Sequence, residues 1–393
     1  MFASFRLRSA ALLFVVYALC ASLAGADAAS GTYTGQLNAR GNYYWERSTR
    51  VVAPSVNASL STPIGVRVDG TYLIDAISSA SVATGTISDR VFTEKRHDVS
   101  VGLGYEIDFG NTQLDLYGTG RVSREPDYKS NRGGFAAALS LDQRNTVLHF
   151  TGYFSHDDVY RVVRMVPADS PGRLVAARAD FVDDLNVLSL GFAWDQVLSR
   201  AITLTLGYDI SLMDGFQANA YRTAKYLTMG GAPEHHPDQR TRNAGYLWYA
   251  HFFEPTRSAI RLGYRYYRDN WDIDAHAIDT RFHQELGQHF EVRLRYRYYT
   301  QSKSYFFKAG GYVAPDTVAG TPGDRYISDD PKMTAFHDHT VGLKMRLSLD
   351  FLSFTKFDFL DTAVLDWGVE YMRITNRYGP YAVVAQGGLG WSF

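Results

Sequence analysis

Arginines occupy every second position in part of the sequence. In the stretch Phe290–Tyr298, Arg293, Arg295 and Arg297 alternate with apolar or aromatic residues. Successive side chains of a β-strand point to opposite faces, so these three guanidinium groups would stand on one face of one strand. Lining a pore, such fixed charges would orient polar solutes and set an ion preference. They could equally pair with acids on adjacent strands and fill the enclosed space.

Further charged residues share this predicted face. Basic residues precede the row on two neighbouring segments, and acidic residues occupy equivalent positions in distant segments. A positive arc would then face a negative one across a lumen. The predicted pore-lining residues are Arg261, Arg265, Arg281, Glu291, Arg293, Arg295, Arg297, Asp69, Asp75, Asp115 and Glu370.

Histidines stand beside carboxylates at three places, which leaves metal binding at a rim open as an alternative. These places are His156–Asp158, Glu234–Asp238 and His337–His339. None has the His-Glu-x-x-His spacing that places two ligands on one helical face. The sequence also contains no Gly-x-Ser-x-Gly elbow, phosphate loop or dinucleotide fingerprint. We therefore predict no metal site, no cofactor and no enzymatic activity.

The composition excludes several classes of protein. Of 393 residues, 46% are hydrophobic, and there are 27 Tyr, 23 Phe and 6 Trp, which is too apolar for a disordered chain. The formal net charge is −1, whereas a nucleic-acid-binding protein would favour a basic surface. One Cys excludes a disulfide framework or a multi-cysteine metal site.

The strongest pattern is a two-residue alternation along most of the chain. The segments Val66–Tyr72, Val99–Glu106, Ile202–Tyr208, Phe290–Tyr298 and Val341–Asp350 all alternate apolar with polar residues. Each would form a strand with one apolar and one wet face. Only a closed barrel satisfies the backbone hydrogen bonds of strands in lipid. The heavily charged polar face favours this all-β transmembrane antiparallel barrel over a soluble sandwich.

Aromatic residues and turn signals support the barrel. Tyr, Trp and Phe gather at strand ends, as at Tyr246–Trp248, Tyr264–Tyr266 and Tyr296–Tyr298, which is typical of membrane girdles. Short turns alternate with longer polar loops, predicted at about 78–95, 125–132, 157–184, 213–241 and 301–333. Counting from a first strand near Leu37–Glu46 gives about 16 strands.

The two ends of the chain carry export and assembly signals. Arg6 and Arg8 precede an apolar run and small-residue cleavage sites, so residues 1–28 are a predicted signal peptide. Residues 29–393 would form the barrel. Its last strand ends on Trp391 and Phe393, which we predict to be the signal read by the barrel-assembly machinery.

Several segments resemble the DUF3570 family of outer-membrane proteins. Asp75–Ser81, Glu125–Ser130, Glu234–Arg242, Tyr264–Trp271 and Arg295–Gln301 are similar to motifs of that family. Ser79 replaces the usual glycine of the first motif. The resemblance implies a barrel and brings no substrate or catalytic residue, because the family's function is unassigned.

Together these patterns predict an outer-membrane channel for passive passage of small or extended polar solutes through a charged lumen. The alternative is a non-conducting barrel that serves as a scaffold for an envelope export, redox or assembly complex. The expected partners are outer-membrane lipid, the assembly machinery and a polar solute, but not nucleic acid; an envelope-complex partner stays open.

Overall fold

The fold was obtained as a computed structural model. It describes residues 33–46, 49–80, 91–164, 177–315, 322–352, 358–375 and 381–393. The predicted signal peptide, residues 1–28, lies outside the described residues.

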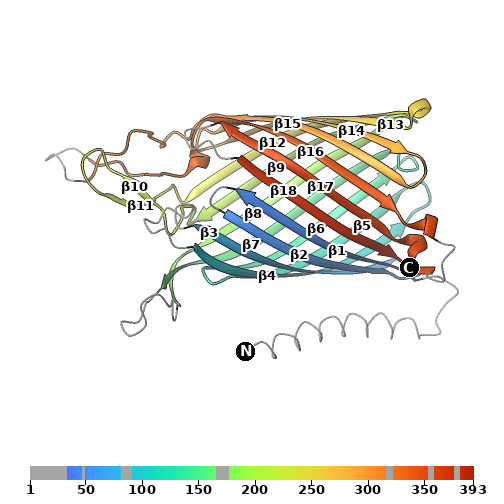
Figure 1. The fold of residues 1–393 in the computed structure, drawn as a ribbon, viewed down its shortest axis with the longest axis horizontal. Helices are drawn as coiled ribbons and strands as arrows, with labels where there is room; N and C mark the ends of the chain where they lie inside the picture. Colours follow the sequence, from blue (N-terminus) through green and yellow to red (C-terminus); the bar gives the residue numbers. More distant parts are fainter. Residues whose placement is uncertain are drawn as a thin grey trace.

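Sixteen strands of the described residues close into one antiparallel barrel (Figure 1). Consecutive strands are neighbours, except that β9 pairs with β12, and β1 closes the barrel on β18. The strands are β1 (Thr34–Glu46), β2 (Thr49–Ser61), β3 (Val66–Ala80), β4 (Val91–Asp108), β5 (Gln113–Arg124), β6 (Tyr128–Leu141), β7 (Thr146–Arg164), β8 (Ala177–Ser199), β9 (Ile202–Gly215), β12 (Gln239–Phe253), β13 (Ser258–Asp269), β14 (Asp274–Leu286), β15 (Phe290–Gln301), β16 (Phe336–Ser348), β17 (Val364–Thr375) and β18 (Tyr381–Ser392). The predicted fold class and strand number are confirmed.

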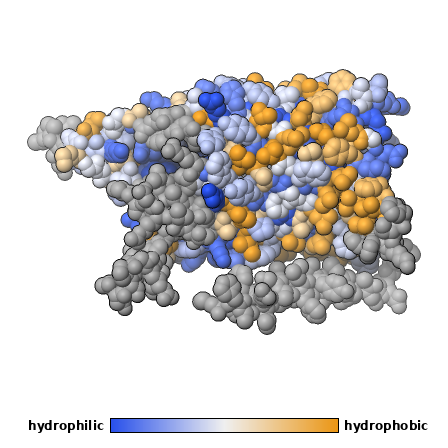
Figure 2. Space-filling model, in the orientation of Figure 1, coloured by the Kyte–Doolittle hydropathy of each residue, from blue (hydrophilic) through white to orange (hydrophobic). Residues whose placement is uncertain are grey.

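The alternation of the sequence separates the two faces of the wall. In β4 the side chains of Val99, Val101, Leu103 and Tyr105 are exposed on the outside, and the residues between them face inward. The same holds around the barrel, and apolar side chains cover much of the wall visible in Figure 2. An apolar outer band around a polar interior is the architecture of a transmembrane barrel of the outer-membrane type.

The two ends of the barrel differ. We call the end with connections at 62–65, 109–112 and 142–145 the turn end; the C-terminus also lies there (Figure 1). The other end, the loop end, carries the long connections 216–238 and 302–335 together with short ones at 125–127 and 270–273. Two predicted loops are wrong in extent, because β7 continues to Arg164 and β6 begins at Tyr128. The start of β6, Tyr128–Arg132, contains no aliphatic residue, so the alternation used to predict strands is missing there.

Two loop-end segments, 216–238 and 302–335, together form what we call the extension. It contains the hairpin β10 (Thr223–Lys225) and β11 (Gly231–Pro233), which projects beyond the barrel (Figure 1). A bridge between His235 and Ile327 joins the two segments.

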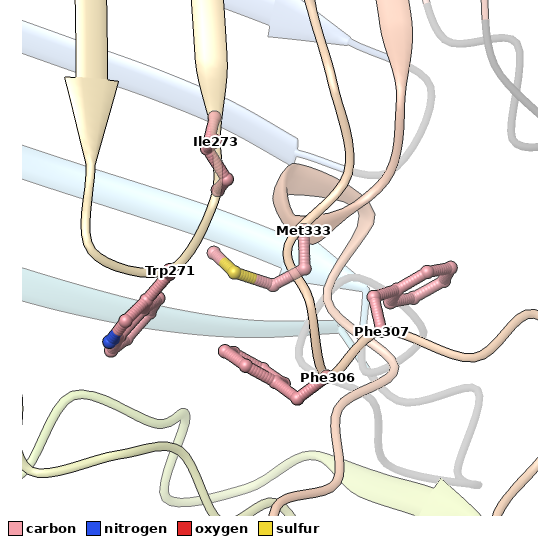
Figure 3. Close-up of a cluster of buried hydrophobic side chains, with 5 residues drawn as sticks. All are labelled: Trp271, Ile273, Phe306, Phe307 and Met333. Carbon is pink, nitrogen blue, oxygen red and sulfur yellow. The ribbon is translucent and has the colours of Figure 1, made fainter.

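The extension has its own hydrophobic core at its junction with the barrel. Trp271 and Ile273, from the β13–β14 connection, pack with Phe306, Phe307 and Met333 (Figure 3). All five side chains are buried. The extension is therefore anchored to the rim by packing as well as by its chain connections.

Among the described residues, helical conformation is confined to short turns. They are η2 (Glu254–Thr256), η3 (Pro331–Met333), η4 (Asp350–Leu352) and η5 (Asp358–Thr362). Within the described ranges, none of these elements has the length and apolar character needed to cross a membrane.

Candidate functional site in the barrel lumen

Every predicted pore-lining residue lies on the inward face of its strand. The assignment follows from the parity of the strands, whose outward positions carry the exposed apolar side chains. We call the inward residues of β13, β14 and β15 the cationic wall, and those of β3, β4 and β5 the acidic wall. In the order of the barrel, these two groups lie half-way round from one another.

Arginines stand directly opposite one another on the cationic wall. Arg281 is the register partner of both Arg261 and Arg295. Like charges at opposite positions destabilise a sheet unless a counter-charge lies between them. Asp279 supplies that counter-charge by accepting hydrogen bonds from Arg281 Nε at 2.9 Å and from Arg295 Nη2 at 2.7 Å.

The remaining acids near this wall each have a basic partner. Arg295 Nη1 also donates to Glu370 Oε1 at 2.9 Å. His283 Nδ1 lies 3.1 Å from Glu291 Oε1. The other two ion pairs are Arg265 Nη2–Asp209 Oδ2 at 3.1 Å and Arg297 Nη1–Asp338 Oδ1 at 3.5 Å. Glu370, Asp209 and Asp338 come from β17, β9 and β16, so the arginines reach sideways along the wall.

Two arginines of the cationic wall have no carboxylate partner within the described ranges, namely Arg261 and Arg293. The Arg261 guanidinium lies 4.4 Å from the centre of the Trp248 ring, a cation–π contact. Arg293 stands opposite Lys344 in the register, and Lys344 is itself paired with Asp366 at 3.1 Å. The wall therefore carries an excess of positive charge.

On the acidic wall, each predicted acid has a local partner. Asp69 accepts a hydrogen bond from the Tyr117 hydroxyl at 2.6 Å. Asp115 pairs with Arg67 at 3.2 Å. Asp75 pairs with Arg96 on the neighbouring strand. The Tyr117 hydroxyl is uncharged, so the negative charge of Asp69 is not compensated and faces the excess positive charge of the cationic wall.

Large inward side chains lie flat against the wall where their neighbours are glycines. The rings of Tyr117 and Trp248 cover Gly102 and Gly263, and a Cβ at either glycine would overlap ring atoms. A ring can lie along the backbone of the next strand only because glycine leaves that space free. Tyr246 and Trp248 were expected in an outer girdle; the structure places both in the lumen, Tyr246 over Gly207.

The ion pairs follow the circumference of the barrel. Every ion pair between strands of the described wall joins strands that are neighbours or next neighbours. The charges are therefore paired along the wall rather than across the lumen. This arrangement combines the two sequence-based alternatives, because the charges pair between strands but leave the opposite walls unconnected.

The interior is denser toward the loop end. Ser155 on β7 and Thr340 on β16 face inward there, and each is 1% exposed. Nearer the turn end, the side chains of Arg67 and Asp195 are 40% and 45% exposed. The lumen is therefore most accessible in its turn-end half.

A buried ion pair joins the loop-end parts of β12 and β13, directly below the extension. Arg240 Nε donates to Asp269 Oδ2 at 2.8 Å, and the guanidinium lies 4.0 Å from the centre of the Trp271 ring. Asp269 Oδ1 also accepts the backbone N–H groups of Trp271 and Ile273, each at 3.0 Å. Two family-like motifs, Glu234–Arg242 and Tyr264–Trp271, thus meet at one point.

A second buried polar network lies inside the extension. His236 Nε2 lies 2.9 Å from Ser328 Oγ, and His236 Nδ1 lies 3.1 Å from the Gln217 carbonyl oxygen. Burial lowers the pKa of His236 to about 4 and raises the pKa of the neighbouring Glu234 carboxyl. Both ring nitrogens of His236 already have protein partners, so this histidine is not free to bind a metal ion. No group of three or more metal-ligating side chains occurs in the described part of the chain.

The closing seam contains the predicted assembly residues. Trp391 of β18 is the register partner of Leu37, and Phe393 exchanges backbone hydrogen bonds with Gly35 at 2.7 and 2.9 Å. The final residues are thus part of the seam that closes the barrel. Their role in assembly stays a prediction.

A family model described as "Protein of unknown function (DUF3570)" matches residues 74–377. No curated protein matches the chain.

The chain is similar to several solved barrels. The siderophore receptor PirA from Acinetobacter baumannii is 9% identical with a TM-score of 0.46, and the match covers 89% of this chain and 54% of PirA. CdiB from Acinetobacter baumannii is 8% identical with a TM-score of 0.47, covering 91% of this chain and 60% of CdiB. OprD from Pseudomonas aeruginosa is 9% identical with a TM-score of 0.40, covering 94% and 98%. The chain thus spans about half the length of PirA.

Proposed function

The chain belongs to the DUF3570 family of proteins of unknown function, and we propose that it acts in the outer membrane as a channel for passive passage of polar solutes. The loop end would face the outside and the turn end the periplasm, the usual orientation of such barrels. A barrel of sixteen strands is wide enough to hold an aqueous channel.

The observation that carries this proposal is that the inward side chains lie along the barrel wall instead of pointing toward the barrel axis. Trp248 and Tyr117 lie over glycines, and the arginines bind acids one or two strands away. Side chains that lie along the wall leave the axis to water and solute. Had the same residues paired across the lumen, they would favour a closed barrel.

The unequal walls would give the channel its selectivity. Arg261 and Arg293 face the lumen without carboxylate partners within the described ranges, whereas on the other wall Asp115 is paired with Arg67 and Asp69 is bonded to an uncharged tyrosine hydroxyl. A transverse field of this kind orients dipolar solutes and raises the local concentration of anions near the cationic wall.

Liposome swelling tests the passage of solutes. Proteoliposomes that contain the purified barrel should swell when they are diluted into isotonic sugars or organic acids, and empty liposomes should not. Equal swelling rates with and without protein would refute a channel for solutes of that size.

The dense loop-end interior favours a second candidate function. Ser155, Asp157, Asp338 and Thr340 are buried there, and the extension has a core of its own. A barrel closed at this end would act as a scaffold that presents the extension to an envelope partner. A folded barrel that gives no swelling above that of empty liposomes would argue for this scaffold role.

The seam residues would also serve assembly. We propose that Trp391 and Phe393 form the terminal signal read by the barrel-assembly machinery. A Phe393→Ala variant should accumulate in the outer membrane more slowly than the native chain, as measured by fractionation. Unchanged accumulation of that variant and of Trp391→Ala would contradict this role.

A further inference from the structure

Hydrogen-bonded pairs of a tyrosine and a histidine recur on the outward face of the barrel near the loop end. At three places in the described strands, a tyrosine hydroxyl lies within hydrogen-bond distance of a histidine Nδ1 on the next strand. These pairs are Tyr72–His97 at 2.9 Å, Tyr264–His276 at 2.7 Å and Tyr296–His339 at 2.9 Å.

The hydrogen bond determines what the histidine offers to its surroundings. When Nδ1 of a neutral imidazole accepts a hydrogen bond from a tyrosine hydroxyl, the single ring proton is on Nε2. The Nε2–H group is then a donor that the tyrosine does not use. His276 and His339 are both exposed, so these donors are available at the outer surface.

An arginine lies next to each of these pairs. Arg373 is directly opposite His339 in the register, and Arg124 is directly opposite His97. Arg268 lies two residues beyond Tyr266, the register partner of His276, and its guanidinium lies 3.9 Å from the carboxylate of Asp274. Each site thus combines an imidazole donor with a guanidinium group.

The Arg373 site is the least neutralised of the three. Arg373 is exposed and has no hydrogen bond or ion pair within the described residues. Its outward neighbours at this level are His337, His339, Tyr371 and Tyr381, none of which is acidic. Asp338, the nearest acid in sequence, faces inward and pairs with Arg297 at 3.5 Å.

The depth of the site identifies the surroundings of these donors. On the same strands, one step toward the turn end, Val341 and Leu294 are exposed on the outside as part of the apolar band. Tyr298 lies beside His339 with ring centres 5.1 Å apart. Aromatic rings at the edge of an apolar band mark the boundary between hydrocarbon and headgroups. The His339 and Arg373 donors therefore lie at headgroup depth.

We propose that Tyr296, His339 and Arg373 form a binding site for the phosphate group of an outer-leaflet lipid. The guanidinium would make charge-assisted hydrogen bonds to phosphate oxygens, and His339 Nε2–H would donate one more. Tyr264, His276 and Arg268 form a similar site on adjoining strands of the same side. The proposal rests on the outer-membrane location proposed above and is independent of whether the lumen conducts.

Another side of the rim shows why this face is selected. Outward positions of β8 and β9 at the loop end carry Asp184 and Asp214, and that of β7 carries Asp158, which stands opposite Lys129 and 3.5 Å from His156. Carboxylates at headgroup depth repel phosphate. A phosphorylated lipid would therefore occupy the β15–β17 side and avoid the β7–β9 side.

The site is tested by native mass spectrometry of the full detergent-solubilised barrel titrated with lipid A. The variant carries His339→Gln and Arg373→Gln, and its folding is checked by heat-modifiable migration on gels. The chain offers a matched control in His251→Gln, because His251 Nδ1 also lies 3.0 Å from a tyrosine hydroxyl, that of Tyr249, but at the turn end and opposite only Ile260 and Ile202.

We expect the double variant to bind lipid A at least about tenfold more weakly than the native barrel, since each charge-assisted hydrogen bond contributes well over the energy of a tenfold change. His251→Gln should bind like the native barrel, and Arg373→Lys should restore part of the affinity of Arg373→Gln. Dephosphorylated lipid A should bind native and double-variant barrels equally and weakly.

Three outcomes would overturn the proposal. Equal lipid A affinity of the native and double-variant barrels would remove the site. Equal affinity of the native barrel for phosphorylated and dephosphorylated lipid A would remove phosphate as the recognised group. Binding of inorganic pyrophosphate as tight as that of lipid A would show a free-phosphate site instead of a lipid site.

Discussion

The lumen wall and the extension use the same charged residue types in opposite ways. In the wall, Arg67 and Asp115 pair while their side chains remain 40% and 30% exposed. Where the loop-end parts of β12 and β13 support the extension, the side chains of Arg240 and Asp269 are 8% and 0% exposed. Exposed pairs contribute little stability and leave their field in the water, whereas a buried pair becomes a structural requirement once formed. The wall is therefore suited to acting on solutes, and the extension to holding one conformation.

The largest effect is expected from removing the buried partner. In an Asp269→Ala variant, Arg240 loses its carboxylate and two backbone N–H groups lose their acceptor. We expect the free energy of opening of the extension to fall by about 3–5 kcal/mol. Hydrogen–deuterium exchange of residues 302–315 measures it.

The matched wall variant sharpens this prediction. Asp115→Asn breaks an exposed pair and should lower the stability of the barrel by less than about 1 kcal/mol. Similar losses in the two variants would contradict the contrast between wall and extension.

The next effect is a pH dependence of the extension. Because the pKa of buried His236 falls to about 4 from an unfolded value near 6.5, the folded state favours the neutral ring. The stabilisation is therefore fully present above about pH 6.5 and is lost as pH falls toward 4, by about 3 kcal/mol. Glu234, whose pKa is raised by burial, acts in the opposite direction and reduces the net loss.

Exchange of the extension at pH 7 and pH 5 measures this loss. The native extension should open more readily at pH 5, while the barrel strands should not change. In His236→Gln, the difference between the two pH values should shrink. An extension equally protected at both pH values would count against a buried neutral His236.

The smallest effect in energy concerns ion selectivity. Removing one uncompensated charge about 7 Å from a permeating ion in water changes its energy by about 0.6 kcal/mol, or about threefold in local concentration. Arg293→Ala should therefore shift permeability toward cations and Asp115→Asn toward anions, as read from reversal potentials. Outward-facing Arg268→Gln should have no effect; a shift as large as that of Arg293→Ala would show that the lumen charges do not set selectivity.

The sequence predicted the wall better than the extension for a physical reason. Strands that separate lipid from water must alternate, so Val99–Glu106 and Phe290–Tyr298 could be recognised from period alone. The extension has no such constraint. Its core joins Trp271 to Phe306 and Met333, and Glu234 to Ser328, through contacts distant in sequence that no local pattern records.

The candidate site was only partly predictable. Alternation places Arg261, Arg281 and Arg295 inward, but only the register shows that Arg281 faces the other two. The same limit explains the error at Trp248, where an aromatic residue near a strand end was assigned to a girdle but faces the lumen beside Arg261. Whether a residue faces inward or outward depends on where its strand is taken to start, and predicted strand boundaries carry errors of a few residues.

Single-channel recording in a planar bilayer tests the central claim most directly. The native barrel should give discrete conductance steps, and in a salt gradient the Arg293→Ala, Arg295→Ala and Arg297→Ala triple variant should show a reversal potential shifted toward cations. A folded native barrel that inserts but gives no conductance steps would contradict the channel. Steps with an unchanged reversal potential in the triple variant would contradict the role of the cationic wall.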